Sequence, residues 1–342
     1  MKKYSLAIVG ATGVVGRCIL KKLEEEKLPI RKYYLFASKN SKGKKIKFMN
    51  KIYKIDELTE KSFNKHIDFA IFSAGSEVAK KFAPIAAEHG TIVIDNSNAF
   101  RMNPVVPLVV PEVNSNEIIK NNGIISNPNC STIQAVVALK PLDEKYKIKR
   151  IVYSTYQAVS GAGRNGIIDL KNGIDDFEYQ NENVDSNIVK SSNYELSKFD
   201  YPIFNNCLPH IDVFEENGYT REETKMINET RKILARPNLP ITATCVRVPV
   251  FNSHSESINV EFENDFKMED LLNTLENADG IVLSRENDKY PIATKVSGND
   301  KVYVGRVRRD FSIKSGINFW CVADNIRKGA ATNAVQILKK LI

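Results

Sequence analysis

The sequence predicts an α/β domain built on a doubly wound parallel sheet, followed by an α+β domain with a mainly antiparallel sheet. In the first part of the chain, short apolar runs alternate with helical segments, the pattern of strands joined by crossover helices. From about residue 153 strand-like segments dominate, and several alternate apolar with polar side chains. The 342 residues exceed one ordinary core, so we expect two domains: residues 1–130, completed by a C-terminal helix at 325–342, and residues 131–324.

The first domain is expected to begin with a buried strand at residues 4–9, which are almost all apolar. A glycine-rich turn follows, and then a helix that ends near Pro29. Further strands are expected at residues 33–37, 67–72 and 91–94, with a helix through Ala87 before the last of them.

In the second domain we expect strands at residues 151–156, 242–250, 257–262 and 301–313, and helices at 221–235 and 268–277. A polar stretch at residues 176–200 is interpreted as a surface excursion and a candidate oligomer contact. The chain closes with an amphipathic helix at residues 325–341.

The composition excludes several classes of protein. The chain is 42% hydrophobic and 26% charged, as globular proteins are. Its five cysteines are widely spaced without a Cys-x-x-Cys pair, so we expect no disulfide framework, no metal site and a cytoplasmic location. The chain contains no run of about 18 apolar residues, so we expect no membrane span. The net charge of +8 is spread along the chain, which favours anionic small ligands over nucleic acid.

Three glycines, Gly10, Gly13 and Gly16, form a Gly-x-x-Gly-x-x-Gly turn between the first strand and the first helix. Such a turn lets the backbone approach a pyrophosphate and directs a helix N-terminus at it. A glycine motif alone is weak evidence, and a merely structural turn is the alternative. Its position at the start of the domain nevertheless predicts a Rossmann-type dinucleotide site.

The end of the second strand distinguishes between the two nicotinamide cofactors. NAD-binding folds usually place an acidic residue there to hold the ribose 2′-hydroxyl. This chain has Ser38, Lys39, Asn40, Ser41 and Lys42 instead. Hydroxyl and ammonium groups suit a 2′-phosphate, so the sequence favours NADP.

Cys130 follows the turn and cap residues Pro128 and Asn129 and precedes an apolar run with helical spacing. It is therefore expected in the first turn of a helix, where free N–H groups and the helix dipole favour negative charge. Such an environment lowers the pKa of a thiol and makes a nucleophilic thiolate available. The alternative is a small buried hydrophobic cysteine.

Other candidate residues lie in four separate segments. A glycine-rich loop follows Gln157, a Val-Pro-Val segment links two more candidates, and two lie on a predicted helix. In isolation each has a simpler explanation, such as a solvated helix face, a surface arginine or a hydrogen-bonded histidine. The candidates are Arg101, Gln157, Glu222, Lys225, Arg247 and His254.

Taken together, the motifs at residues 10–16, 126–132, 157–163, 247–250 and 324–330 resemble those of aspartate-β-semialdehyde dehydrogenase, in order along essentially the whole chain. The resemblance implies NADPH-dependent, reversible reductive dephosphorylation of β-aspartyl phosphate to aspartate-β-semialdehyde. This reaction serves lysine, threonine, methionine and diaminopimelate biosynthesis. It also implies a homodimer or a dimer of dimers.

The resemblance also assigns roles to residues. Cys130 would form an acyl thioester and His254 would act as acid and base. Gln157 would position the acyl group, Arg247 would hold the substrate carboxylate, Glu222 would lie near the substrate amine, and Arg101 and Lys225 would bind phosphate. The expected cofactor contacts are Gly10, Thr12, Gly13, Val14, Val15, Gly16, Ser38, Lys39, Asn40, Ser41, Ser160, Gly161 and Asn325.

One position departs from the family pattern, which often has Arg-Ser where this chain has Asn40 and Ser41. Lys39 or Lys42 is therefore the alternative reader of the 2′-phosphate.

Three competing functions remain. N-acetyl-γ-glutamyl-phosphate reductase has a similar organisation, but its acylated substrate amine gains nothing from Glu222. A glyceraldehyde-3-phosphate-type dehydrogenase has a different context around its cysteine and histidine. A non-catalytic NADP-binding regulator would not need Cys130, Gln157, Arg247 and His254 together. Thiol alkylation with and without substrate would separate a regulator from an enzyme.

Overall fold

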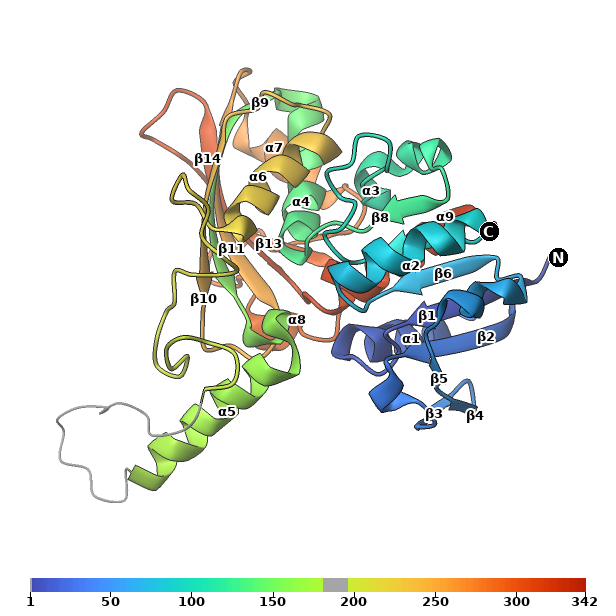
Figure 1. Cartoon of the computed structure of the whole chain (residues 1–342). Helices are drawn as coiled ribbons and strands as arrows, with labels where there is room; N and C mark the ends of the chain where they lie inside the picture. Colours follow the sequence, from blue (N-terminus) through green and yellow to red (C-terminus); the bar gives the residue numbers. More distant parts are fainter. Residues whose placement is uncertain (1, 181–195) are drawn as a thin grey trace. The chain divides into compact units, whose positions relative to one another are not determined.

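The computed structural model describes residues 2–180 and 196–342 (Figure 1). Residues 181–195, which make up most of the expected polar excursion, lie outside the described residues. The chain forms two compact units. Unit 1 contains Met1–Lys140, Asn228–Asn238 and Ile326–Ile342, and unit 2 contains Pro141–Ile227 and Leu239–Asn325.

Unit 1 is built on a six-stranded sheet in which every pairing is parallel. This confirms the expected doubly wound α/β fold. Both faces of β1 are buried: Leu6 and Ile8 belong to one core cluster, and Ala7 and Val9 belong to another. In sheet order the strands are β5 (Asp56–Glu57), β2 (Ile30–Ala37), β1 (Tyr4–Val9), β6 (Phe69–Phe72), β7 (Ile92–Asp95) and β8 (Ile124–Ser126).

Helices α1 (Val14–Glu26) and α2 (Ser76–Glu88) follow β1 and β6, as the sequence predicts. An antiparallel hairpin, β3 (Lys45–Phe48) and β4 (Lys51–Lys54), was not predicted. Shorter helical segments complete the unit: 3₁₀ turns at Lys39–Ser41, Glu60–Lys65 and Ser115–Lys120, and α3 at Pro111–Asn114.

The C-terminal segment differs from the single α-helix that we expected. A π-helical segment, Arg327–Thr332, precedes the regular helix α9 (Asn333–Leu341). Ile337 and Leu338 of α9 are fully buried in the same core cluster as Leu6 and Ile8 of β1. The end of the chain is therefore part of the core of unit 1.

Unit 2 contains a six-stranded mixed sheet. The pairings of β11 with β9 and β14, and of β13 with β14, are antiparallel, whereas β9–β10 and β12–β13 are parallel. The expected mainly antiparallel sheet is thus present. In sheet order the strands are β10 (Ile241–Arg247), β9 (Ile148–Gln157), β11 (His254–Phe262), β14 (Gly316–Ala323), β13 (Val302–Arg309) and β12 (Ile281–Leu283).

Five strand boundaries differ from the expected ones by three or four residues: β2, β9 and β11 begin early, and β10 and β13 end early. The expected strand at residues 242–250 ends at Arg247, two residues before Pro249, which cannot donate to a sheet ladder. The expected strand at residues 301–313 ends at Arg309. There the Asp310 carboxylate accepts hydrogen bonds from the backbone N–H and hydroxyl of Ser312, which makes a turn into the unpredicted strand β14.

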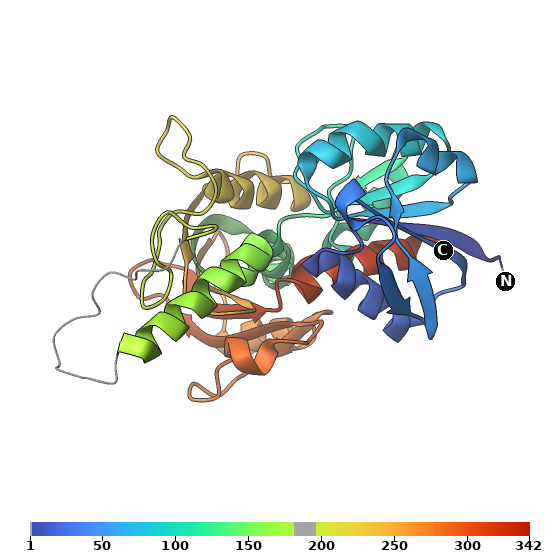
Figure 2. The same ribbon diagram turned by 60° about the horizontal axis from the view of Figure 1, so that its bottom comes forward.

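The helices of unit 2 include α5 (Gly163–Gln180), α7 (Met268–Glu276) and α8 (Ala293–Val296). Helices α4 (Cys130–Tyr146) and α6 (Arg221–Ile233) each cross the boundary between the units along the chain. Helix α5, which was not predicted, projects from the body of its own unit in both views (Figures 1 and 2). Among the described helices, none has both the length and the apolar character needed to cross a bilayer.

Candidate active site

The glycine turn of unit 1 has the geometry that a dinucleotide requires. Gly10 has a φ of +88°, and a Cβ there would overlap the carbonyl oxygen of Ser73. A Cβ on Gly16 would overlap the carbonyl oxygen of Gly10. Gly13, by contrast, is the N-cap of α1, and a Cβ added there would lie 3.4 Å from the carbonyl oxygen of Gly10. The turn therefore brings the N-terminus of α1 close to the end of β1 and leaves room above it, which fits a pyrophosphate.

The segment after β2 is folded beside this turn. The hydroxyl of Ser41 lies 3.5 Å from that of Thr12 on the glycine turn. Lys39 and Asn40 are exposed in the 3₁₀ turn that Ser41 ends. Lys42 forms an ion pair with Glu57 at 3.2 Å. The ammonium group of Lys42 thus already has a carboxylate partner, which makes Lys39 the better candidate to reach a 2′-phosphate.

Cys130 is the first residue of α4, as the cap pattern predicts. The first helical hydrogen bond runs from the N–H of Ile133 to the carbonyl of Asn129 at 2.9 Å. The thiol of Cys130 lies 3.6 Å from Oδ1 of Asn129. A Cβ on Gly329 would lie 2.7 Å from Cβ of Cys130, so only glycine lets the C-terminal segment pack this close to the thiol.

Two other cysteines have environments unsuited to a nucleophile. Cys245 and Cys321 are fully buried in the sheet of unit 2. Burial, together with the negative charge of nearby glutamates, raises the pKa of both thiols well above the usual value. Both are therefore inert thiols at neutral pH.

Arg101 is a buried side chain held in a fixed orientation. Its Nε donates to the carbonyl of Asn127 at 3.0 Å and its Nη2 donates to the carbonyl of Asn96 at 2.8 Å. Its Nη1 donates to the carboxylate of Glu229 at 2.9 Å. The sequence analysis missed Glu229. Its spacing from Glu222 is seven residues, or about two helical turns, which places both side chains on the same face of α6. That spacing is the sequence signal that could have identified it.

In unit 2, Gln157 and Arg247 are neighbours in register at the ends of the parallel strands β9 and β10. The amide of Gln157 donates to Glu222 at 3.0 Å. Lys225 donates to the other oxygen of Glu222 at 3.2 Å and to Asp212 at 2.7 Å. Four of the predicted residues of unit 2 therefore form one hydrogen-bonded or strand-paired cluster.

His254 begins β11 and is 1% exposed. Its Nδ1 accepts a hydrogen bond from the backbone N–H of Ala158 at 3.0 Å. Burial, reinforced by the positive charge of Arg247 and partly offset by Glu222, lowers the pKa of His254 to about 3. The imidazole is neutral at pH 7, and its proton is on Nε2. This pKa lies well below the ordinary value for histidine because the ring is buried beside a cation.

Arg247 and His254 both border Gly161. Nη1 of Arg247 donates to the carbonyl of Ala158 at 2.7 Å. A Cβ on Gly161 would lie 3.0 Å from Nη1 of Arg247 and 3.2 Å from Nε2 of His254. Glycine at this position therefore keeps the space beside both groups open for a ligand.

Ser160 and Asn325 are also joined within unit 2. The amide of Asn325 donates to the hydroxyl of Ser160 at 3.0 Å, and its Oδ1 accepts from the N–H of Ser253 at 2.9 Å. Asn325 is thus bonded to Ser253, the residue that directly precedes His254.

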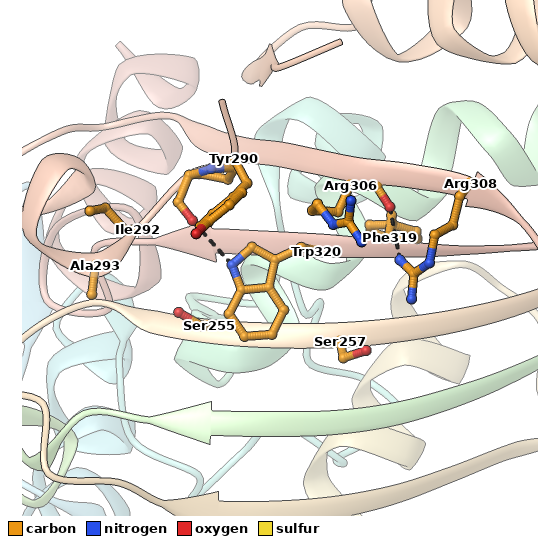
Figure 3. Close-up of a pocket in the computed structure, with 10 residues that line it drawn as sticks. Ser255, Ser257, Tyr290, Ile292, Ala293, Arg306, Arg308, Phe319 and Trp320 are labelled. Carbon is orange, nitrogen blue, oxygen red and sulfur yellow. Dashed lines mark hydrogen bonds between the residues drawn. The ribbon is translucent and has the colours of Figure 1, made fainter. Parts of the chain in front are cut away.

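A pocket of about 360 Å³ lies on the other face of the unit 2 sheet (Figure 3). Ser255 and Ser257 of β11 line it, whereas His254 and Glu256, which alternate with them, point to the opposite face. Trp320 donates to the carbonyl of Pro291 at the pocket. The pocket is therefore separate from the cluster around His254.

Within the described ranges, no group of three or more His, Cys, Asp or Glu side chains is placed to hold a metal ion.

Comparisons with known proteins identify the family. Residues 5–121 match the family described as "Semialdehyde dehydrogenase, NAD binding domain", and residues 139–328 match "Semialdehyde dehydrogenase, dimerisation domain". Aspartate-semialdehyde dehydrogenase of Aquifex aeolicus is 50% identical over 99% of this chain and 98% of its own length. The enzyme of Bacillus subtilis is 43% identical over 98% and 96%.

A solved structure agrees with these relatives. It is that of aspartate semialdehyde dehydrogenase II of Vibrio cholerae complexed with ASA, with a TM-score of 0.94 and 44% identity, covering 100% of this chain and 98% of that chain. Both family matches and the full-length relatives lead to one conclusion. The chain belongs to the aspartate-semialdehyde dehydrogenase family.

Proposed function

We propose that this chain catalyses the reversible, NADPH-dependent reductive dephosphorylation of L-aspartyl-4-phosphate to L-aspartate-4-semialdehyde. The observation that carries the proposal is the position of Cys130 as the first residue of α4, in a chain whose full-length relatives are aspartate-semialdehyde dehydrogenases. The reaction serves lysine, threonine, methionine and diaminopimelate biosynthesis, and we place it in the cytoplasm. Residues 1–130 with 325–342 bind the cofactor, and residues 131–324 supply catalysis and dimerisation.

In the first step the thiolate of Cys130 attacks the acyl carbon of the aspartyl phosphate. The carbon–oxygen bond to phosphate breaks, phosphate leaves with the electron pair, and an acyl thioester forms on Sγ. The helix N-terminus at Cys130 favours the anionic sulfur. Arg101 and Lys225 supply positive charge for the departing phosphate.

Reduction of the thioester is the chemistry that NADPH supplies when bound. The glycine turn would hold its pyrophosphate, and Ser160, Gly161 and Asn325 would supply further contacts to the cofactor. Nε2 of His254, which carries the ring proton because Nδ1 accepts from Ala158, would donate to the acyl oxygen as negative charge develops on it. When the aldehyde forms, the bond between the acyl carbon and Sγ breaks, the sulfur leaves with the electron pair, and Cys130 is again a thiolate.

Arg247 and Glu222 recognise the two ends of the amino-acid backbone. The guanidinium of Arg247 binds the α-carboxylate, and the carboxylate of Glu222 binds the free ammonium group. Gln157 connects Glu222 and Arg247, because it donates to Glu222 and is paired in register with Arg247. An N-acetylated substrate has no ammonium group for Glu222, which disfavours N-acetyl-γ-glutamyl-phosphate reductase.

The direct test is reduction of NADP by aspartate semialdehyde, followed at 340 nm with and without inorganic phosphate. We expect turnover that requires phosphate. A non-catalytic NADP-binding regulator would bind the cofactor without turnover. A reductase for the acetylated substrate would prefer N-acetylglutamate semialdehyde in the same assay.

Replacing Arg247 with lysine tests the recognition of the carboxylate. Lysine keeps the charge but loses the planar two-point grip. We expect kcat/KM for aspartate semialdehyde to fall by roughly 2–5 kcal/mol in transition-state free energy, the usual cost of breaking a buried charge pair. Part of the loss should appear in kcat, because a misplaced carboxylate misplaces the reacting carbonyl.

Lys225→Ala is the matched comparison for Arg247→Lys. It should raise the KM for phosphate more than the KM for the semialdehyde. The two variants are to be measured with each ligand varied separately. If both variants raised the KM for the same ligand and left the KM for the other unchanged, this division of roles would be incorrect.

Replacing Lys39 with alanine tests the choice of cofactor. We expect the KM for NADP to rise and the KM for NAD to change little, because only NADP carries the 2′-phosphate. Lys42→Ala is the control and should have the smaller effect, since Lys42 is paired with Glu57. Equal catalytic efficiency of the unmodified enzyme with NADP and NAD would contradict the proposed use of this loop.

We place the dimer contact on the face of the unit 2 sheet that carries the pocket of Figure 3. Tyr156, Tyr290 and Ile292 are exposed there, with 39%, 51% and 38% of their surfaces accessible. Residues 139–328 match a dimerisation domain, so a second copy of the chain is the expected cover. Two such dimers can join into a dimer of dimers; sedimentation of the native protein distinguishes the two states.

A further inference from the structure

Glu229 on α6 joins two parts of unit 1 through a single carboxylate. The side chain is 1% exposed. Its Oε1 accepts from Nη1 of Arg101 at 2.9 Å, and its Oε2 accepts from the backbone N–H of Asn129 at 2.7 Å. Asn129 directly precedes Cys130. One buried side chain therefore contacts both the guanidinium of Arg101 and the turn that presents the thiol.

Arg101 reinforces this connection. Its bond from Nε to the carbonyl of Asn127 reaches the same turn, two residues before Asn129. The three bonds within the described residues use one N–H on each nitrogen of the guanidinium. A guanidinium has five N–H groups, so one on each terminal nitrogen remains for a ligand. Arg101 can therefore bind phosphate without giving up its contact with Glu229.

Lys232, one turn further along α6, holds the backbone around Arg101. Its ammonium group donates to the carbonyls of Arg101, Asn103 and Val106, each at 2.8 Å. An ammonium group has three donors, and all three are used. The segment that carries Arg101 is thus fixed to α6 at its backbone by Lys232 and at its side chain by Glu229.

We propose that Glu229 is a positioning residue that fixes the Arg101 guanidinium and the Cys130 turn in one arrangement, so that phosphate binding at Arg101 is coupled to the placement of the thiol. The inference rests on the proposed roles of Arg101 and Cys130. The carboxylate also balances the buried charge of Arg101 when phosphate is absent, which removes the cost of an unpaired buried cation.

Glu229→Gln tests this coupling. The amide has one acceptor oxygen and an NH₂ group that can only donate, so it cannot accept from both Arg101 and Asn129. Glu223→Gln is the matched control. Glu223 lies on the same helix, is also buried, and likewise accepts two backbone bonds, from Thr220 and Cys245, but contacts neither Arg101 nor the Cys130 turn.

We expect Glu229→Gln to raise the KM for phosphate and to lower kcat, each by about ten-fold, because small misplacements of reacting groups are costly. The KM for NADP should change by less than two-fold. The second readout is alkylation of Cys130 by iodoacetamide, followed by mass spectrometry of the peptide that contains it. Inorganic phosphate should slow alkylation in the unmodified protein, and about ten times more phosphate should be needed in Glu229→Gln.

Glu223→Gln should lower the melting temperature without changing the phosphate dependence of either readout. If Glu229→Gln behaved in the same way, Glu229 would be a structural residue and the proposal would be overturned. Absence of turnover in the unmodified protein would instead count against the proposed function itself.

Arg101→Lys provides a second route should Glu229→Gln fail to fold. In this variant one nitrogen replaces the three that donate to residues 96, 127 and 229, so the planar fork is lost and the rate of Cys130 alkylation should change even without phosphate. An unchanged rate in that variant would contradict the coupling.

Discussion

Cys130→Ser is expected to abolish turnover, by about 10³-fold or more, while NADP binding and the fold persist. A serine hydroxyl is scarcely ionised at neutral pH, whereas a thiol at a helix N-terminus is a ready source of thiolate. The replacement is nearly isosteric, so the close packing against Gly329 should be retained. The measurements are phosphate-dependent NADP reduction, a melting curve and NADP titration of the same preparation.

Cys207→Ala is the control for this variant, because Cys207 is exposed. It should keep most of the activity, as should alanine at Cys18, Cys245 and Cys321. Substantial turnover by Cys130→Ser would remove the basis for a thioester mechanism.

His254→Asn is expected to slow the chemical step by about 10²–10⁴-fold with little change in the KM for the semialdehyde. Asparagine is the appropriate replacement because its Oδ1 can accept the Ala158 N–H in place of Nδ1. The Nε2–H group that would donate to the acyl oxygen is lost. Stopped-flow measurement of NADPH formation separates this step from product release. An unchanged chemical step would leave His254 with a structural role alone.

The same variant has an expected effect on acid stability. His254 has a pKa of about 3 in the folded chain, against about 6.5 when unfolded. Between these values the unfolded chain binds a proton that the folded chain does not, so stability falls as the pH drops below about 6.5. At pH 5 the loss should be about 2 kcal/mol, from about 1.4 kcal/mol per pH unit. Urea unfolding at pH 7.5 and pH 5 should show a smaller loss for His254→Asn.

The parts of the fold that the sequence predicted are those with strong local signals. The strand at Tyr4–Val9 is apolar except for Ser5 and is followed by a glycine that needs a positive φ. Cys130 follows residues that favour a helix N-terminus, and it is found there. In both places the local backbone preference and the burial pattern agree, so the sequence pattern is enough to predict the element.

The parts that were missed depend on contacts distant in the chain. In the sequence, Glu229 is indistinguishable from the other charged residues of a polar helix. Only the folded chain brings it into contact with Arg101, 128 residues away. The low pKa of His254 follows from burial beside Arg247, which no local pattern reveals. The π-helical turn at Arg327–Thr332 likewise places Gly329 against Cys130. Tertiary packing determines all three features.

The division of unit 1 into three segments has a consequence for how the enzyme is made. A ribosome completes residues 1–140 long before it reaches residues 326–342, yet Ile337 and Leu338 fill the core against β1. While unit 2 is synthesised, the part of the unit 1 core that Ile337 and Leu338 cover in the folded chain therefore stays exposed. Because Gly329 belongs to residues 326–342, Cys130 acquires this neighbour only after unit 2 has been synthesised. A half-made chain thus carries no finished active site.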